Sequence, residues 1–155
     1  MAQHEVIDLS NKHLNDGTLS ALAASLQSEA NSFQCLQLYL AGNVITERGC
    51  PALSSLISHL PHLTQLDLSR NKLKGTSAAR ALAKTIEGAP TLRSLVLTGN
   101  EFGPHGTPII SEMFKKLSIL RRLDLGWITW SKSEDGSITA SGPAHSHQEE
   151  SYSSY

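Results

Sequence analysis

Apolar residues recur along this 155-residue chain at a nearly constant interval. Segments 63–73 (LTQLDLSRNKL) and 92–102 (LRSLVLTGNEF) share the skeleton L-x-x-L-x-L-x-x-N-x-φ, where φ is an apolar residue. Segment 35–45 (CLQLYLAGNVI) fits this skeleton with a cysteine in the first position, and segments 4–14 and 120–130 are degraded copies. The third apolar positions are 31, 28, 29 and 28 residues apart: Leu9, Leu40, Leu68, Leu97 and Leu125. Five copies at this period predict a repeat architecture.

Each copy begins with a short strand and a turn. Alternation around Leu66 and Leu68 places two leucine side chains on one face of a strand. An asparagine then suits the turn, because its short amide side chain can bond backbone groups that the bend leaves unpaired. Stacked copies of this turn predict a structural ladder of asparagines, formed by Asn43, Asn71 and Asn100.

A helix follows the turn in each of the first four copies. Apolar residues spaced by three and four give every helical segment one apolar stripe. Candidate N-caps are Asp16, Thr76 and Thr107, and a further helix is expected to begin near Pro51. A unit of this size cannot bury its stripe alone, so the units must stack. The sequence therefore predicts an α/β fold over residues 1–130: a short solenoid with about five parallel strands on its concave face and four helices on its convex face.

The skeleton in segments 35–45, 63–73 and 92–102 resembles the ribonuclease-inhibitor-like class of leucine-rich repeats, and the resemblance covers about residues 4–130. This class includes ribonuclease inhibitor, GTPase activators of the Ran type, tropomodulin-like actin regulators and the sensor ends of cytosolic innate-immune receptors. The resemblance implies a protein-interaction module, a scaffold or adaptor, that binds a partner through its concave face and loop tips. The alternatives are a GTPase-activating accessory protein of the Ran-activator type and a sensor fragment of a larger immune receptor.

In such units the variable strand positions point to the concave face. Tyr, Trp and Arg are frequent in the residues that dominate interface energetics, and Asp and Arg can supply complementary charges. The candidate partner-binding residues are Asp8, Gln37, Tyr39, Gln65, Asp67, Arg70, Arg93, Val96, Arg122, Asp124 and Trp127. In the alternative interpretation, these are solvated side chains whose Asp and Arg groups neutralise one another across adjacent strands.

The repeat pattern fails at both ends of the chain. Ile128 occupies the asparagine position of the last copy, and Lys12 occupies that of the first. Either Trp127, Ile128 and Trp130 form a cap over the last repeat, or the chain is a fragment or short isoform of a longer repeat protein. Residues 131–155 contain eight serines, no leucine and a net charge of −3, which predicts a disordered, acidic tail.

Composition narrows the function classes. A net charge of −1 and a pI near 6.6 argue against nucleic-acid binding. Two cysteines and the absence of a signal peptide or a long apolar segment favour a reducing, cytoplasmic location without membrane contact. The sequence contains no phosphate-binding glycine motif, nucleophile elbow or metal signature, so we expect no enzymatic activity, no cofactor and no metal site.

Overall fold

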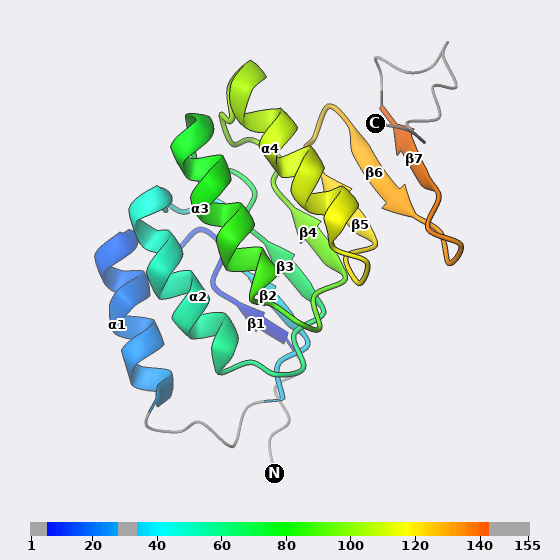
Figure 1. Cartoon of the computed structure of the whole chain (residues 1–155). Coiled ribbons are helices and arrows are strands. Elements are labelled where there is room, and N and C mark those ends of the chain that lie inside the picture. The colour runs from blue at the N-terminus through cyan, green and yellow to red at the C-terminus, as the bar shows by residue number, and fades with distance from the viewer. Residues whose placement is uncertain (1–5, 28–33, 143–155) are drawn as a thin grey trace.

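Short parallel strands, one from each repeat, lie side by side in the computed structural model of the chain (Figure 1). The structure describes residues 6–27 and 34–142. The parallel strands are β1 (Val6–Asp8), β2 (Gln37–Tyr39), β3 (Gln65–Asp67), β4 (Ser94–Val96) and β5 (Arg122–Asp124). They pair in sequence order with their central apolar residues in register, so the period of the sequence becomes a stack in space.

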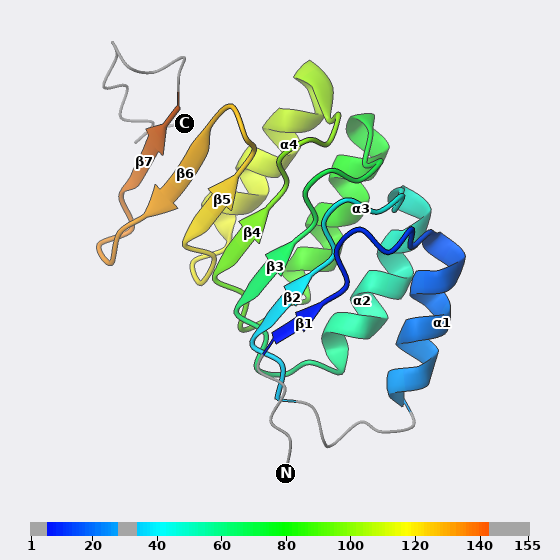
Figure 2. The same cartoon turned by 180° about the vertical axis from the view of Figure 1, so that it is seen from behind.

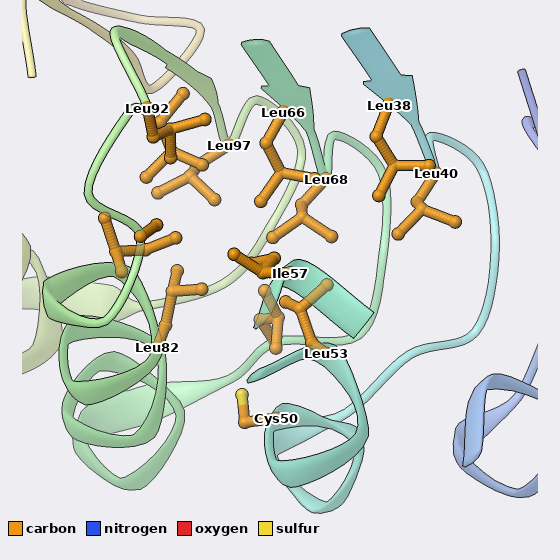
Figure 3. Packing of buried hydrophobic residues seen from close by; sticks show 14 of the residues in the cluster. Leu38, Leu40, Cys50, Leu53, Ile57, Leu66, Leu68, Leu82, Leu92 and Leu97 are labelled. Atoms are coloured by element: carbon orange, nitrogen blue, oxygen red, sulfur yellow. The ribbon is translucent and has the colours of Figure 1, made fainter. Parts of the chain in front are cut away.

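The helices of the described segments form one layer against this sheet (Figures 1 and 2). They are α1 (Asp16–Gln27), α2 (Cys50–Ser58), α3 (Gly75–Glu87) and α4 (Gly103–Lys116), with a short 3-10 helix, η1 (Glu47–Gly49), before α2. Leu66 and Leu68 point from the sheet toward Leu53 and Ile57 of α2 and Leu82 of α3 (Figure 3). The core therefore lies between one layer of strands and one layer of helices, an α/β arrangement.

The helix starts differ from the predicted caps. Asn15, rather than Asp16, caps α1: its Oδ1 accepts the Thr18 N–H at 2.9 Å, and its own N–H donates to Thr18 Oγ1 at 2.8 Å. Thr76 and Thr107 lie inside α3 and α4, because each helix begins earlier, at a glycine with a positive φ. The α2 helix begins beside Pro51, as predicted.

The asparagine after each of β2, β3 and β4 bonds to the turn of the preceding repeat. Asn71 is 5% exposed; its Oδ1 accepts the Ile45 N–H at 3.1 Å, and its Nδ2 donates to the Leu40 carbonyl at 2.9 Å. Asn43 and Asn100 make the equivalent pairs of bonds. These three side chains thus connect four consecutive turns of the chain.

A hairpin extends the sheet beyond β5. Strand β6 (Thr129–Lys132) pairs antiparallel with β5, and β7 (Ile138–Ser141) pairs antiparallel with β6. The expectation of a disordered tail over 131–155 is therefore corrected for residues 131–142, and the boundary expected at residue 130 falls inside β6. Residues 143–155 lie outside the described part of the chain.

A few specific contacts attach this hairpin. The Lys132 Nζ donates to the carbonyls of Phe114 and Leu117, at 2.7 and 2.8 Å, and lies 4.6 Å from the centre of the Phe114 ring. These carbonyls belong to the C-terminal end of α4, where a cation is favoured. Trp130 contacts the same ring, with centroids 6.0 Å apart. The serine-rich composition conceals the hairpin because a few contacts hold it: those of Lys132 and Trp130, and the packing of Ile138 and Ala140 against the core.

Candidate functional site

The face of the sheet opposite the helices is the side seen in Figure 2. We call it the open face and define it by the first and third residues of β1 to β5, which point away from the buried central residues. The strand register aligns the third residues in one row: Asp8, Tyr39, Asp67, Val96 and Asp124. It aligns the first residues in a second row: Val6, Gln37, Gln65, Ser94 and Arg122. Most of the predicted partner-binding residues are therefore brought together on one surface.

A small polar network lies at the middle of the open face. The Tyr39 hydroxyl donates to Gln37 Oε1 at 3.0 Å and accepts a hydrogen bond from Gln65 Nε2 at 3.4 Å. All three side chains are half-buried, and they come from neighbouring strands. The network holds the Tyr39 hydroxyl in place on this face.

The three aspartates of the open face also have a structural role. Asp8, Asp67 and Asp124 each accept the backbone N–H of the residue two positions later, at 2.9, 2.8 and 2.8 Å. The hydrogen bond from the Ser10 backbone is the largest cause that lowers the pKa of Asp8 below its usual value. The recurring Asp-Leu-Ser or Asp-Leu-Gly sequence signals this turn, and the sequence prediction did not use it.

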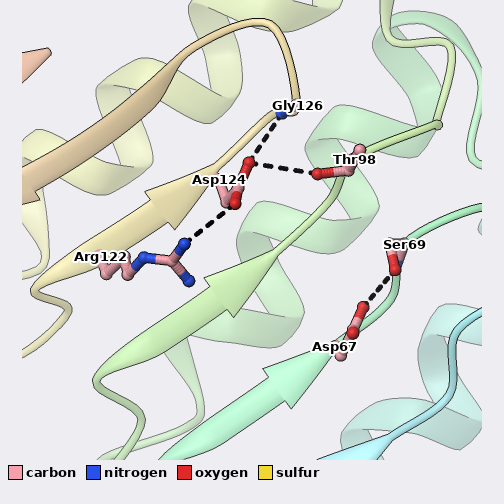
Figure 4. Close-up of polar contacts among 6 residues, drawn as sticks. All are labelled: Asp67, Ser69, Thr98, Arg122, Asp124 and Gly126. Atoms are coloured by element: carbon pink, nitrogen blue, oxygen red, sulfur yellow. Dashed lines mark hydrogen bonds and ion pairs between the residues drawn. The ribbon is translucent and has the colours of Figure 1, made fainter. Parts of the chain in front are cut away.

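Charge pairing on this face is local. Arg122 lies 3.0 Å from Asp124 Oδ2, and Asp124 Oδ1 also accepts a hydrogen bond from Thr98 at 3.2 Å (Figure 4). Both ionic partners come from β5, so this neutralisation occurs within a strand rather than across strands. Asp67 accepts from Ser69 instead of an arginine (Figure 4). The arginines of the candidate site are therefore not all equally available to a partner.

The other three predicted residues lie outside the strand rows. Arg70 is exposed, and its Cγ is 2.9 Å from the position that a Cβ on Gly99 would take, so glycine leaves the space in which this side chain lies. Arg93 is exposed and directly precedes β4. Trp127 is 54% exposed and lies after β5, where it lines a cavity at the ends of β4 and β5. The structure thus places Arg70 and Arg93 beside the open face and Trp127 at a separate site.

Other chemistry is sparse in the described residues. No group of three or more His, Cys, Asp or Glu side chains there has an arrangement suited to a metal ion. Burial raises the pKa of Cys50 to about 11, and Cys35 is also buried. Over the same residues, no helix is long and apolar enough to cross a membrane.

Comparison with known proteins identifies the repeats. A family model described as "Leucine Rich repeat" matches residues 59–80 and 88–106. A curated relative, the Mus musculus "NACHT, LRR and PYD domains-containing protein 14", is 32% identical over 121 residues, which are 77% of this chain. This chain is a leucine-rich-repeat protein. The leucine-rich-repeat chain spans 12% of the length of that relative.

A solved structure has a similar arrangement. The structure titled "Structure of Chaetomium Mex67:Mtr2 subunits" contains a chain that is 26% identical to this leucine-rich-repeat protein, with a TM-score of 0.53. The likeness covers 76% of this chain and 79% of that one. It supports the α/β fold of strands and helices described above.

Proposed function

We propose that this leucine-rich-repeat protein is a non-enzymatic interaction module that binds a partner protein through the open face. In this proposal the stacked repeats form a short cytoplasmic solenoid, with β1 to β5 on its concave side and α1 to α4 on its convex side. One observation carries the proposal: the strand register aligns the first and third residues of five strands, most of them polar and one of them Tyr39, in two rows. The helices lie on the other side of the sheet (Figure 2).

The residues of this surface have different roles in the proposed binding. Tyr39 supplies a large, pre-oriented contact at the middle, of the kind that often dominates interface energetics. Arg70 and Arg93 are exposed cations beside it, suited to acidic groups on the partner. Arg122 contributes less in this proposal, because its guanidinium already pairs with Asp124.

The test compares two triple variants in affinity capture with quantitative mass spectrometry. The first, Tyr39→Ala with Arg70→Ala and Arg93→Ala, removes the proposed contacts. The control, Arg80→Ala with Lys84→Ala and Glu87→Ala, changes exposed residues of α3 on the helical side. We expect proteins captured by the wild type and the control to be lost from the open-face variant. Equal capture by both variants, with unchanged circular dichroism, contradicts the proposal.

A second candidate function is favoured by the match to the NACHT, LRR and PYD domains-containing protein. In this proposal the repeats act as the interaction segment of a larger, multidomain protein. An antibody against residues 59–106 tests it by immunoblotting of cells that express the gene. A band far above 16.7 kDa supports the candidate, and a single band near 16.7 kDa contradicts it.

A further inference from the structure

The turn after each of the first four strands contains a residue with a positive φ, directly before the asparagine position of the skeleton. These residues are Asn11, Gly42, Arg70 and Gly99, with φ angles of 57°, 67°, 53° and 77°. Glycine has no Cβ and adopts this left-handed conformation freely, and asparagine tolerates it. In arginine the Cβ comes close to the following carbonyl oxygen. Arg70 therefore holds a strained conformation at a position where the equivalent residues of the other repeats are relaxed.

Arg70 is also unusual among the non-glycine residues that have a positive φ. In the described part of the chain these residues are Asn11, His13 and Arg70. Asparagine and histidine are enriched in this backbone region, whereas arginine is not. A residue that its surroundings hold in a strained conformation often has a functional role. The contacts of the Arg70 side chain show whether its role is structural.

The Arg70 side chain extends along the turns between two glycines. Its Cγ lies 2.9 Å from the place that a Cβ on Gly99 would take, and its Nη2 lies 3.6 Å from the corresponding place on Gly42. Gly42 follows β2, the strand that carries Tyr39. The guanidinium is thus at the border of the open face, near the end of the strand that supplies the tyrosine of that face.

This guanidinium has no polar partner in the part of the chain that the structure describes. Arg70 is exposed, and it forms neither a hydrogen bond nor an ion pair with the described residues. Two arginines at β5 are engaged instead: Arg121 donates from Nη1 to the Ser133 carbonyl at 2.7 Å, and Arg122 pairs with Asp124. The described polar contacts therefore give no structural reason for an arginine at this strained turn.

The charges of the open face restrict the anion that this guanidinium can bind. Asp8 and Asp67 lie in the row of third residues, and the whole chain has a net charge of −1. These carboxylates repel a polyanion such as a nucleic acid. A single carboxylate matches the planar fork of N–H donors, which binds it through two parallel hydrogen bonds. Charge complementarity favours one acidic side chain in an otherwise neutral or basic segment.

We propose that Arg70 determines the specificity of the open face by binding one aspartate or glutamate side chain of the partner protein beside Gly42. The partner segment carries neutral or basic residues where it meets Asp8 and Asp67. This inference rests on the proposed function, because it names the group that the open face recognises. It adds that the arginine at this turn serves binding at a cost to the stability of the fold.

The test uses a displayed library of random dodecapeptides, selected on the immobilised wild-type protein. Peptides that no longer bind a folded Tyr39→Ala protein are assigned to the open face. We expect each of these peptides to contain an aspartate or glutamate whose exchange for asparagine or glutamine weakens binding at least about tenfold. Peptides that depend on Tyr39 but need no carboxylate overturn this inference and leave the proposed function standing. A library without any Tyr39-dependent peptide counts against both proposals.

A double-mutant cycle assigns the carboxylate to Arg70. In the Arg70→Asn protein, the acidic peptide and its amide form are expected to bind equally, because the guanidinium is absent. Arg70→Lys keeps the charge but loses the fork of donors, so it restores only part of the affinity. The control, His13→Asn, makes the same exchange at another positive-φ residue and leaves the affinity of both peptides unchanged. An equal preference for the acidic peptide in the wild type and in Arg70→Asn overturns the proposal.

Urea denaturation of the same Arg70→Asn protein separates binding from a structural role. Asparagine, which repeat 1 carries at this position as Asn11, adopts a positive φ more readily than arginine does. We expect the unfolding equilibrium constant to fall by about threefold or more, so the urea midpoint rises while acidic peptides are lost. A lower midpoint means that Arg70 stabilises the fold, and it overturns the proposal.

Discussion

Replacing Asn71 with alanine tests the bonds that connect the repeats. The side chain lies in the middle of the stack and is 5% exposed. Asn71→Ala removes the acceptor of the Ile45 N–H and the donor to the Leu40 carbonyl, while the strands and helices keep their own apolar contacts. The loss in stability therefore reports on the hydrogen bonds of this amide, which include two within its own turn, to the Leu68 and Ser69 carbonyls.

The expected magnitude comes from the fate of each backbone partner. The Leu40 carbonyl still accepts a hydrogen bond from Asn43, so its loss is partial. Ile45 is 1% exposed, and its N–H is left without that acceptor, which costs about 1–3 kcal/mol. With about 0.5–1.5 kcal/mol for the lost bond to Leu40, the free energy of unfolding falls by about 1.5–4.5 kcal/mol. That is a large fraction of the roughly 5–15 kcal/mol that stabilises an ordinary domain.

Urea denaturation followed by far-ultraviolet circular dichroism measures this loss. The matched control is Asn100→Ala at the last position of the ladder, where the half-buried side chain borders the cavity and water can replace the missing amide. We expect a loss of about 1 kcal/mol for the control. A loss below about 0.5 kcal/mol for Asn71→Ala, the size of a surface substitution, or a larger loss for Asn100→Ala, refutes the reasoning.

Three further predictions concern the core and the hairpin. Leu68→Ala, at a fully buried position, lowers the free energy of unfolding by about 2–5 kcal/mol in the same assay, and a loss below about 0.5 kcal/mol contradicts its inward orientation. Lys132→Met removes the bonds to Phe114 and Leu117, so amide hydrogen exchange accelerates in β6 and β7 but not in β2 and β3; uniform acceleration argues against a local role. Because burial raises its pKa to about 11, Cys50 reacts with a disulfide reagent at pH 8 about 100-fold more slowly than a free thiol does, whereas reaction at the free-thiol rate means that the site opens.

Periodicity predicted the fold of the central repeats because equivalent side chains occupy equivalent positions in every repeat. Leu38, Leu66 and Leu95 occupy one position of the skeleton, and they occupy one row of the sheet. Alternation around them was sufficient to predict which side chains, such as Tyr39, face away from the core. Local strand geometry therefore carried most of the information about the candidate site.

Features that occur once were not predictable in this way. The hairpin depends on Lys132 reaching the carbonyl end of α4, a contact between residues that no repeat relates. The α3 and α4 helices begin at Gly75 and Gly103, which have a positive φ, and not after the threonines that cap propensity favours. The partners of Asp67 and Asp124 were also missed, because a preference for local turn bonds competes with pairing across strands. The cavity lined by Phe102 and Trp127 was also not predictable, because it depends on the path of the chain after β5, where the repeat pattern ends.

Site-specific photo-cross-linking tests most directly whether the open face binds a protein. A photoreactive benzoylphenylalanine replaces Tyr39 at the middle of the open face or Lys84 on the exposed side of α3. Both proteins are expressed at equal levels in cells, irradiated and analysed for adducts of higher mass. Binding through the open face predicts a discrete protein adduct from position 39 and none from position 84. Adducts from position 84 with none from position 39 contradict it.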